Sequence, residues 1–512
     1  MLQINNLTLT HIRDLRTMIK DFSLTLNPGD KAAVIGEEGN GKSTLLKLIY
    51  DESMVSSYTQ HTGSIIKNGA KIGYLAQELT PAEREQSIYD FCGEKPAFFD
   101  ATPKELALLS RQLGLTKEFF YSDRTVDSLS GGEKVKLQLA LILMERPDVL
   151  LLDEPSNDID IETLHWLETF IKEAHVPVLF ISHDEVLLEN TANMVVHLEL
   201  LHRKTVPRST VIKMPYAEYV GTRLCSLEKQ GQLARKERSE YQKQQERFRQ
   251  IEQKVEHRQN TISRQDAHGG RLLKKKMHAV KSLERRFEKE HQNMTELPVT
   301  EDAILIRFDE NLKIPNGKRV LDFTLDELTV EDRVLSRDIK LQITGPQKIC
   351  IIGKNGVGKS TLLKKQAAQL CERTDIAAYY MPQNYEELLD FKKTPIEFLC
   401  VTGDKSEQAT IRNTLAGMKY TAEEMDHKIA DLSGGQKAKL FFLKMARAGY
   451  NVLILDEPTR NFSPLSGPVI RQLLRDFGGA ILSVSHDRKY IREVCGRVYE
   501  LTGEGLSETE NV

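Results

Sequence analysis

Two kinds of hydrophobic pattern occur along the chain. Short apolar runs such as "KAAVIG" and "KICIIG" end in glycine loops, and "DVLLLDEP" and "NVLILDEP" lie between turn residues. Continuous Val, Ile and Leu runs of this length are typical of parallel strands that are buried on both faces. The other pattern places apolar residues at every seventh position of a long polar stretch, which is typical of packed helices. The sequence therefore predicts an α/β protein that also contains a long helical segment.

The α/β pattern occurs twice. Three motifs recur: "GEEGNGKST" at Gly36 as "GKNGVGKST" at Gly353, "LSGGEK" at Leu129 as "LSGGQK" at Leu432, and "ISHD" at Ile181 as "VSHD" at Val484. The last two motifs are offset by 303 residues and the first by 317, so the first half holds 14 extra residues around "DESMVSSYTQHTGSIIKNGA". A repeat of this kind indicates two homologous domains. We place them at 1–215 and 300–512, with 216–299 between them.

The intervening segment 216–299 has the pattern of a helical hairpin. Its seven-residue apolar repeat consists of Leu227, Ala234, Tyr241, Phe248 and Val255, followed by Leu273, Val280 and Phe287, with Met277 between. This seam predicts one helix at about 220–258 and a second from Arg271 to near His291. "NTISRQDAHGG" interrupts the repeat, and because Gly269 and Gly270 disfavour helix, we predict the tip near 260–271. The unequal lengths mean either that part of the first helix docks on the first domain or that the second begins before Arg271.

Charge is distributed unevenly. The formal net charge of the chain is −3, but residues 221–292 hold 19 Lys and Arg against 10 Asp and Glu, a net of +9, so the remainder carries −12. Basic residues on the outward faces of the hairpin include Lys274, Lys275, Lys276, Lys281, Arg285 and Arg286. Such side chains neutralise phosphates with little regard to sequence, and structured RNA is read mainly by shape and backbone. A basic hairpin favours RNA binding over a solvated spacer, although its charges do not distinguish RNA from DNA.

Composition excludes several classes of protein. With 512 residues and 40% hydrophobic residues, the chain can form more than one globular core. No apolar run approaches the roughly 18–20 residues of a membrane helix, and "MLQINNLTLTHIRD" lacks the pattern of a secretory signal. The six cysteines are scattered without a CxxC pair, which favours free thiols in a reducing compartment. We therefore expect a cytoplasmic protein.

Both glycine loops fit G-x-x-x-x-G-K-[ST], the pattern of phosphate-binding loops. Glycines let backbone N–H groups surround phosphate oxygens, and the N-terminus of the next helix adds positive potential. Lys42 and Lys359 are expected to reach the β- and γ-phosphates of ATP, and Ser43 and Ser360 to bind Mg²⁺. The nucleotide-binding residues of the two loops are Gly36, Glu37, Glu38, Gly39, Asn40, Gly41, Lys42, Ser43 and Thr44, and Gly353, Lys354, Asn355, Gly356, Val357, Gly358, Lys359, Ser360 and Thr361.

Paired carboxylates follow two of the predicted strands. Asp153 and Asp456 end the runs "VLLLD" and "VLILD", where a carboxylate can face Mg²⁺. Glu154 and Glu457 come next. A carboxylate at this place can polarise the attacking water, whereas the alternative is a solvated surface acid.

These motifs together resemble the ATP-binding-cassette (ABC) superfamily, and "LSGGE" and "LSGGQ" are its most specific marks. The resemblance covers both repeats and implies an ATPase with two composite sites, each formed by the phosphate loop of one cassette and the signature of the other. Gln77 in "YLAQE" and Gln383 in "YMPQN" resemble the Q-loop glutamines that reach the metal, and His183 and His486 resemble the switch histidines. The signature residues that would cap ATP are Ser130, Gly131, Gly132, Ser433, Gly434 and Gly435.

Two features depart from the superfamily pattern. The loop after the first "DEP" reads "SNDID" and its counterpart reads "TRNFS", so Arg460 replaces Asn157 and Ser463 replaces Asp160. Because this loop crosses the interface between cassettes in the superfamily, these substitutions allow the two sites to hydrolyse ATP at different rates. The residue that stacks on adenine is not evident, and His11 is the candidate.

Two cassettes, no membrane segment and a charged linker resemble the ABC-F family of translation factors, and "SRQDAHGGRLLKKKMHAVKS" and "DEPTRNFSPLS" resemble its antibiotic-resistance branch (Lsa-, Vga- and Msr-like). The resemblance implies a monomer with an intramolecular cassette dimer that binds the ribosome over the E site and points its linker at 23S rRNA, P-site tRNA and the peptidyl-transferase centre. It also implies protection against drugs of that centre, such as lincosamides, pleuromutilins and streptogramin A. The residues expected to contact RNA are Arg264, Gln265, Asp266, Ala267, His268, Arg271, Lys274, Lys275 and Lys276.

Three other functions fit parts of the sequence. A housekeeping ABC-F factor would act on stalled ribosomes without any drug. A DNA-associated ATPase of the Uup-like kind would use the same basic hairpin on another polyanion. A detached transporter motor would need a membrane partner, but the basic hairpin argues against this reading.

Overall fold

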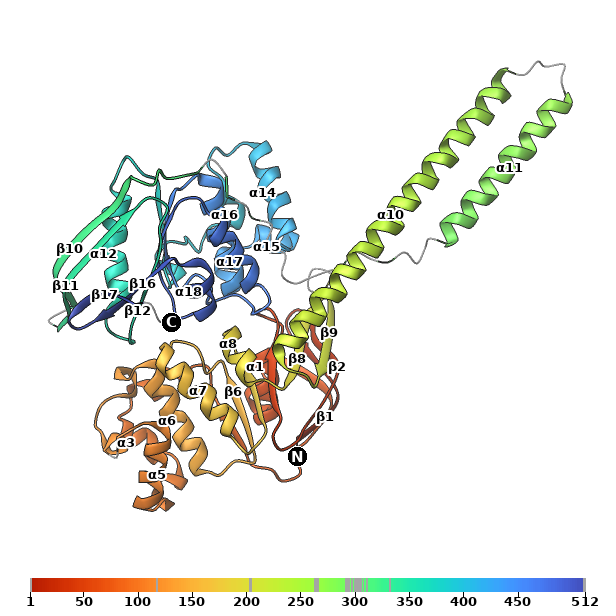
Figure 1. Cartoon of the computed structure of the whole chain (residues 1–512). Helices are drawn as coiled ribbons and strands as arrows, with labels where there is room; N and C mark the ends of the chain where they lie inside the picture. The colour runs from red at the N-terminus through yellow and green to blue at the C-terminus, as the bar shows by residue number, and fades with distance from the viewer. Residues whose placement is uncertain are drawn as a thin grey trace. The chain divides into compact units, whose positions relative to one another are not determined.

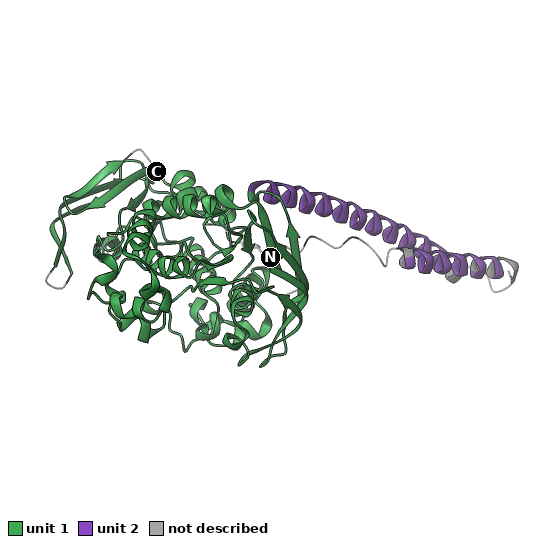
Figure 2. Ribbon diagram, turned by 90° about the horizontal axis from the view of Figure 1, so that it is seen from below, with its two compact units in different colours: residues 1–216, 301–512 green, residues 217–300 purple. Residues whose placement is uncertain are grey.

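The computed structural model describes residues 2–116, 118–201, 205–261, 267–290, 295, 298, 306, 308–309, 312–330 and 333–509. The chain forms two compact units, shown in Figure 2: residues 1–216 with 301–512, and residues 217–300. The first unit contains both repeats, and the second contains the segment that separates them in the sequence.

Each repeat of the first unit is built on a six-stranded sheet (Figure 1). In the first repeat the strand order is β5 (Ile72–Leu75), β6 (Val149–Asp153), β7 (Val178–Ile181), β3 (Lys31–Ile35), β8 (Met194–Leu200) and β9 (Val206–Ile212). In the second it is β13 (Ala378–Met381), β14 (Val452–Asp456), β15 (Ala480–Val484), β12 (Lys348–Ile352), β16 (Arg497–Thr502) and β17 (Gly505–Thr509). All neighbours are parallel except the final pair of each sheet. Every residue of β6 and β14 is buried, which confirms the predicted parallel α/β fold.

Helices flank these strands in the same order in both repeats. In the first they are α1 (Lys42–Tyr50), α6 (Gly131–Met144), α7 (Ile161–Glu173) and α8 (Glu185–Thr191). In the second they are α12 (Lys359–Cys371), α16 (Gly434–Ala448), α17 (Gly467–Asp476) and α18 (Arg488–Val494). Each phosphate loop therefore joins a buried central strand, β3 or β12, to the N-terminus of the helix that follows it.

The repeats differ in a small antiparallel sheet. The first has three strands in the order β2 (Thr17–Leu26), β1 (Leu2–His11) and β4 (Thr59–Ile66), whereas the described residues of the second form β10 (Arg319–Val330) and β11 (Arg333–Thr344). Strand β4 pairs with β1 and lies within the stretch that holds the 14 extra residues of the first repeat. The insertion thus adds one strand to the edge of this sheet.

Short helices precede the signature in each repeat. They are α2 (Pro81–Glu85), α3 (Ile88–Gly93), α4 (Pro96–Asp100) and α5 (Pro103–Leu113) in the first, and α13 (Pro395–Leu399), α14 (Lys405–Gly417) and α15 (Ala422–Asp426) in the second. Three of them, α2, α5 and α13, begin with Thr-Pro-x-Glu. The Thr hydroxyl accepts from the third residue's N–H and the Glu side chain reaches back to the Thr, a reciprocal cap that defines the start of each helix.

The second unit is a hairpin of two helices, α10 (Tyr216–Thr261) and α11 (Ala267–Glu290). Its seam follows the seven-residue repeat: the rings of Tyr241 and Phe287 stack at 5.3 Å between centroids, and Phe248 lies 5.6 Å from Phe287. Of the two alternatives for the unequal helix lengths, the structure shows that the second helix begins before Arg271, because α11 begins at Ala267 and includes Gly269 and Gly270. Glycine costs only about 1 kcal/mol in a helix, and in the first turn there are few intrahelical bonds to lose.

Candidate functional site

The two phosphate loops have the same backbone path. Gly36 and Gly353 have φ of 143° and 145°, and a Cβ at these positions would approach the carbonyl oxygens of Leu198 and Leu501 to 2.2 and 2.5 Å. Only glycine fits both restrictions. The lysine of each loop turns back on it: Lys42 Nζ donates to the carbonyl of Gly36 at 2.8 Å, as Lys359 Nζ does to Gly353.

The signature motifs form the N-termini of α6 and α16. Ser130 and Ser433 are the N-caps, and Glu133 and Gln436 complete a capping box in each helix. The box uses the N–H of the third helical residue and of the cap itself. The N–H groups of the two signature glycines remain at the helix end, where an anion is favoured by the helix dipole.

Residues from both repeats line one large cavity. It measures about 900 Å³ and brings the second phosphate loop to the first signature. Its walls include the following predicted site residues: Ser130, Gly131, Asn355, Gly356, Val357, Gly358, Lys359, Ser360, Thr361, Gln383, Asp456, Glu457 and His486. This volume and this set of residues fit a nucleoside triphosphate. The aliphatic side chains of Val330, Val334 and Leu335 complete the lining.

The first phosphate loop contacts the second signature directly. Glu38 Oε2 accepts a hydrogen bond from the backbone N–H of Gly435 at 2.9 Å. Glu37 Oε1 lies 3.3 Å from Lys439 Nζ, on the same helix α16. In each pairing, then, the phosphate loop of one repeat lies against the signature of the other.

The strand-end aspartates have surroundings suited to Mg²⁺. Ser43 Oγ donates to Asp153 Oδ1 at 2.9 Å, and Asp456 Oδ1 is buried without a hydrogen-bond partner among the described residues. Burial raises the pKa of Asp153 to about 6, an effect that Ser43 opposes, and burial also raises the pKa of Asp456. A cation would relieve this cost. Among the described residues there is no cluster of three His, Cys, Asp or Glu that could hold a metal.

Three side chains hold Glu154 at the first site. Gln77 Nε2 and Asn157 Nδ2 donate to Glu154 Oε2 at 2.9 and 2.5 Å, and His183 Nε2 lies 3.3 Å from Oε1. Burial raises the pKa of Glu154, but the hydrogen bond and charge of His183, with Lys42 and Asn157, outweigh it and bring the pKa to about 2. Glu154 is therefore ionised at neutral pH.

Glu457 at the second site has weaker partners. Its Oε2 accepts from Ser485 Oγ and the backbone N–H of His486, each at 3.3 Å, and His486 Nε2 is 3.8 Å from Oε1. Burial and the neighbouring Asp456 raise the pKa of Glu457 to about 8. Burial and the charge of Lys359 lower the pKa of His486 to about 4. The second Glu–His pair is therefore neutral at pH 7.

Both glutamates have an uncommon backbone. Glu154 has φ of 50° and Glu457 has φ of 51°, in the left-handed region. A residue with a long side chain in this region is held there by its surroundings, at a cost of order 1–3 kcal/mol. The same conformation recurs in both repeats, directly after the strands β6 and β14 and before a proline.

The motifs did not single out Asp158, which joins the two repeats. Its Oδ2 accepts from Arg460 Nη2 at 2.8 Å, its Oδ1 lies 3.4 Å from Gln383 Nε2, and its carbonyl accepts from Asn355 Nδ2 at 2.5 Å. Gln383 is thus turned to Asp158, whereas its counterpart Gln77 is bonded to Glu154. The substitution of Arg460 for Asn157 was the sequence signal that could have led to this residue.

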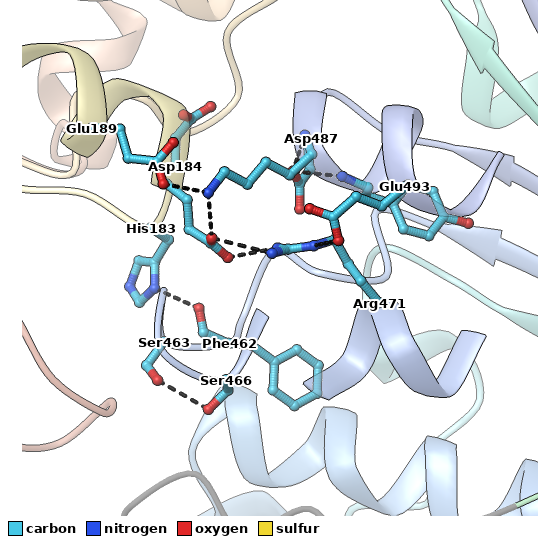
Figure 3. A network of polar contacts seen from close by, with 12 residues as sticks. His183, Asp184, Glu189, Phe462, Ser463, Ser466, Arg471, Asp487 and Glu493 are labelled. Carbon is cyan, nitrogen blue, oxygen red and sulfur yellow. Dashed lines mark hydrogen bonds and ion pairs between the residues drawn. The ribbon is translucent and has the colours of Figure 1, made fainter. Parts of the chain in front are cut away.

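A second contact between the repeats consists of buried ion pairs, part of which is drawn in Figure 3. Arg471 Nη1 lies 2.6 Å from Glu185 Oε1 and its Nε 2.8 Å from Glu493 Oε2. Arg488, 1% exposed, pairs with Glu168 at 2.6 Å and Asp184 at 3.0 Å. Beside this network His183 Nδ1 lies 2.8 Å from the carbonyl oxygen of Phe462, so the histidine is fixed from the other repeat. Sequence reasoning named only His183 from this region.

The predicted RNA-contacting residues lie in or beside α11. Arg271, Lys274, Lys275 and Lys276 have exposed side chains, as do Lys281, Arg285 and Arg286. Arg264, Gln265 and Asp266, and the side chains of Ala267 and His268, lie outside the described residues.

A family model described as "ABC transporter" matches residues 19–157 and 336–460. Both matched stretches contain the phosphate loop, the signature and the paired carboxylates located above. The chain belongs to this family of ATPases, as an ABC-F protein with two cassettes. None of the described helices is long and apolar enough to span a membrane.

Several relatives align over nearly the whole chain. "ABC transporter F family member 5" of Arabidopsis thaliana is 27% identical and is matched over 95% of this chain and 73% of its own length. "Ribosome protection protein VmlR" of Bacillus subtilis is 28% identical over 97% of this chain and 86% of its length. Among solved structures, the archaeal ribosome recycling factor aABCE1, in complex with stalk protein aP1, superposes with a TM-score of 0.57 at 14% identity and covers 98% of this chain and 90% of that one. The last similarity concerns the fold alone.

Proposed function

We propose that this ABC-F ATPase binds the ribosome in the cytoplasm and protects it from antibiotics of the peptidyl-transferase centre. On this proposal the cassettes cover the E site and the hairpin α10–α11 extends to 23S rRNA and P-site tRNA. The protein displaces tRNA or the drug pocket and need not touch the drug. The exposed basic face of α11 is the single observation that carries the proposal.

The hairpin has the features that an RNA-directed arm requires. Phe287 and Val255 are buried on the seam between the two helices, while the outer faces carry the exposed cations together with a few exposed apolar side chains such as Leu272 and Leu283. Exposed cations along one helix neutralise phosphates without reading sequence. The relative VmlR is named a ribosome protection protein, which favours this function over a general translation factor.

The cassettes supply the switch in this proposal. ATP would lie between the phosphate loop of one cassette and the signature of the other, with Lys42 and Lys359 on its phosphates. Ser43 with Asp153 and Ser360 with Asp456 would hold Mg²⁺, which supplies charge neutralisation for the leaving phosphate. Glu154 is ionised and can accept a proton from water, while Glu457 must lose its own proton first. Binding of ATP closes the two cassettes on each other and favours the ribosome-bound form. Hydrolysis of ATP allows the protein to leave the ribosome.

The double substitution Glu154→Gln and Glu457→Gln tests the coupling of hydrolysis to release. We expect ATP to remain bound, turnover to fall by about 10²-fold or more, and the protein to stay with ribosomes during sedimentation. A matched double substitution of exposed acids, Glu173→Gln with Glu423→Gln, should leave turnover unchanged. Rapid dissociation of the inactive variant from ribosomes would contradict the coupling.

The basic face is tested by Lys274→Gln, Lys275→Gln and Lys276→Gln together. We expect weaker ribosome binding and a log–log dependence of affinity on salt that is shallower by about 2, while ATP hydrolysis is retained. The control neutralises three exposed lysines of the second cassette, Lys365, Lys392 and Lys405. Equal loss of binding in both triple variants would indicate a general charge effect and contradict the assigned face.

Drug sensitivity separates protection from the alternatives. Cells with and without the gene are compared for minimum inhibitory concentrations of lincosamides, pleuromutilins and streptogramin A. Unchanged sensitivity to all three would favour a housekeeping role on stalled ribosomes. Preferential retention of branched DNA over ribosomes, with ATP present, would favour the DNA-associated ATPase.

A further inference from the structure

The two phosphate loops differ at the residues that face the opposite signature. The first loop has Glu37 and Glu38 where the second has Lys354 and Asn355. Glu38 accepts from Gly435 N–H, whereas Asn355 donates to the carbonyl of Asp158. The same position therefore presents an anion in one site and a hydrogen-bond donor in the other.

Glu38 lies at the end of a helix that favours anions. Gly435 follows the N-cap Ser433 by two residues, and its N–H is one of those that the capping box leaves available. A Cβ built on Gly434 would lie 3.2 Å from both carboxylate oxygens of Glu38, so the carboxylate lies against both signature glycines of α16. The backbone N–H of Gly435 can donate to a carboxylate oxygen or to a phosphate oxygen. If both anions approach this N–H, they repel each other in a partly buried space.

The neighbouring charges keep Glu38 in place. Glu37 pairs with Lys439 of α16, whose side chain is 8% exposed. At the second site the corresponding contacts are directed elsewhere: Lys354 pairs with Glu162 at 3.2 Å, and Lys136, the counterpart of Lys439, lies 5.0 Å over the ring of Trp166. Glu38 also lines a polar cavity of about 620 Å³ with Gln77 and Glu154, close to where the γ-phosphate is expected.

We infer that Glu38 is a built-in competitor of the triphosphate at the first site. Its carboxylate occupies the signature N–H that would otherwise receive the terminal phosphate, so the first site binds ATP more weakly than the second and discriminates less between ATP and ADP. Glu38 is thus a residue that determines the affinity of one site and makes the two sites unequal. The inference rests on membership of the ABC ATPases and not on the proposed role at the ribosome.

The test measures nucleotide binding at the first site alone, without ribosomes. Lys359→Ala weakens the second site, and fluorescent ATP and ADP analogues are titrated with Mg²⁺ in that background, with and without Glu38→Gln or Glu38→Asn. We expect ATP to bind about tenfold more tightly in both Glu38 variants, as for removal of one charge-assisted competitor, with less than about twofold change for ADP. Unchanged or weaker ATP binding would overturn the inference.

The matched control introduces the acid into the other loop. In a Lys42→Ala background, Asn355→Glu should weaken ATP binding at the second site more than ADP binding. The full chain with both lysines intact gives a second measurement, since wild-type protein should show two classes of ATP site and Glu38→Gln should bring them together. If the two classes of ATP site differ in affinity by the same factor in Glu38→Gln as in wild type, the inference is also overturned.

Discussion

The first and second nucleotide sites place the same backbone around different charges. Both phosphate loops have the same glycine geometry, and Glu154 and Glu457 both have φ near 50°. Around them the charges differ: Glu154 is held by a histidine, a glutamine and an asparagine, whereas the described residues at hydrogen-bond distance from Glu457 offer a serine hydroxyl and a backbone N–H. A duplicated domain thus keeps its backbone geometry and varies its electrostatics, because geometry is fixed by glycines and buried strands while charge depends on single exposed or half-buried residues.

The third motif and the start of the helix that follows it, α8 or α18, show the same principle at the contact between repeats. The first reads "SHDEVL" and the second "SHDRKY". Glu185 of the first faces Arg471 and Lys489 of the second, and Arg488 inserts between Glu168 and Asp184. Equivalent positions therefore became complementary, which fits two repeats of one chain better than two identical copies.

The largest effect on this contact is expected from Arg488→Met. The substitution leaves Glu168 and Asp184 buried without their cation, which typically costs about 3–5 kcal/mol. Unfolding monitored by temperature or urea should show this loss, and Lys365→Met, an exposed cation of α12, should change stability by less than about 0.5 kcal/mol. A loss below about 1 kcal/mol for Arg488→Met would mean that the network adds little to the packing of the repeats.

The substitution Glu457→Gln tests whether the pKa of Glu457 differs from that of Glu154. The unfolded carboxyl ionises near 4.5, but in the folded protein it keeps its proton up to about pH 8. Between about pH 4.5 and 8 this carboxyl is ionised in the unfolded state but still protonated in the folded state. The free energy of unfolding therefore falls as the pH rises through this range. The variant avoids this loss, so we expect it to be more stable than wild type by about 4 kcal/mol at pH 8 and by almost nothing at pH 4. A pH-independent difference would contradict the raised pKa.

Glu154→Gln should change stability in the opposite direction. The pKa of Glu154 is about 2, below the 4.5 of the unfolded chain. Ionised Glu154 therefore stabilises the folded protein above about pH 4.5, and this contribution is lost as the pH falls towards 2. We expect the variant to be about 2–3 kcal/mol less stable than wild type at pH 7, with a smaller difference at pH 3.5. Thermal midpoints of both proteins at the two pH values provide the measurement.

The smallest change in stability is expected for Asp158→Asn. The side chain of Asp158 is 56% exposed, so its pair with Arg460 contributes at most about 1 kcal/mol. Gln383 would lose its charged partner and become available to Glu457, as Gln77 is to Glu154. In a Glu154→Gln background, which leaves the second site to report, we expect ATP turnover to rise about two- to fivefold. Unchanged turnover would show that Asp158 does not restrain the second site.

Much of the fold could be predicted because it depends on local patterns. The runs "VLLLD" and "VLILD" are buried strands because they are apolar throughout, and the Thr-Pro-x-Glu segments begin helices because they satisfy their own backbone. The seven-residue repeat located the seam of the hairpin down to Tyr241, Phe248 and Phe287. The sequence left two explanations for the unequal helix lengths, and the start of α11 at Ala267 could not be chosen from it because two glycines penalise a helix only slightly.

The candidate sites divide in the same way. The sequence by itself determined the phosphate loops, the signature caps and the position of Glu154 and Glu457, since glycine, serine and carboxylate at fixed spacing have few other uses. Only the tertiary structure decided that Glu38 lies on Gly435, that Asp158 draws Gln383 and Arg460, and that Arg488 is buried between two acids. These contacts join residues about 225 to 400 positions apart, and the free energy of such a pair depends on burial and partner distance, which no local pattern contains.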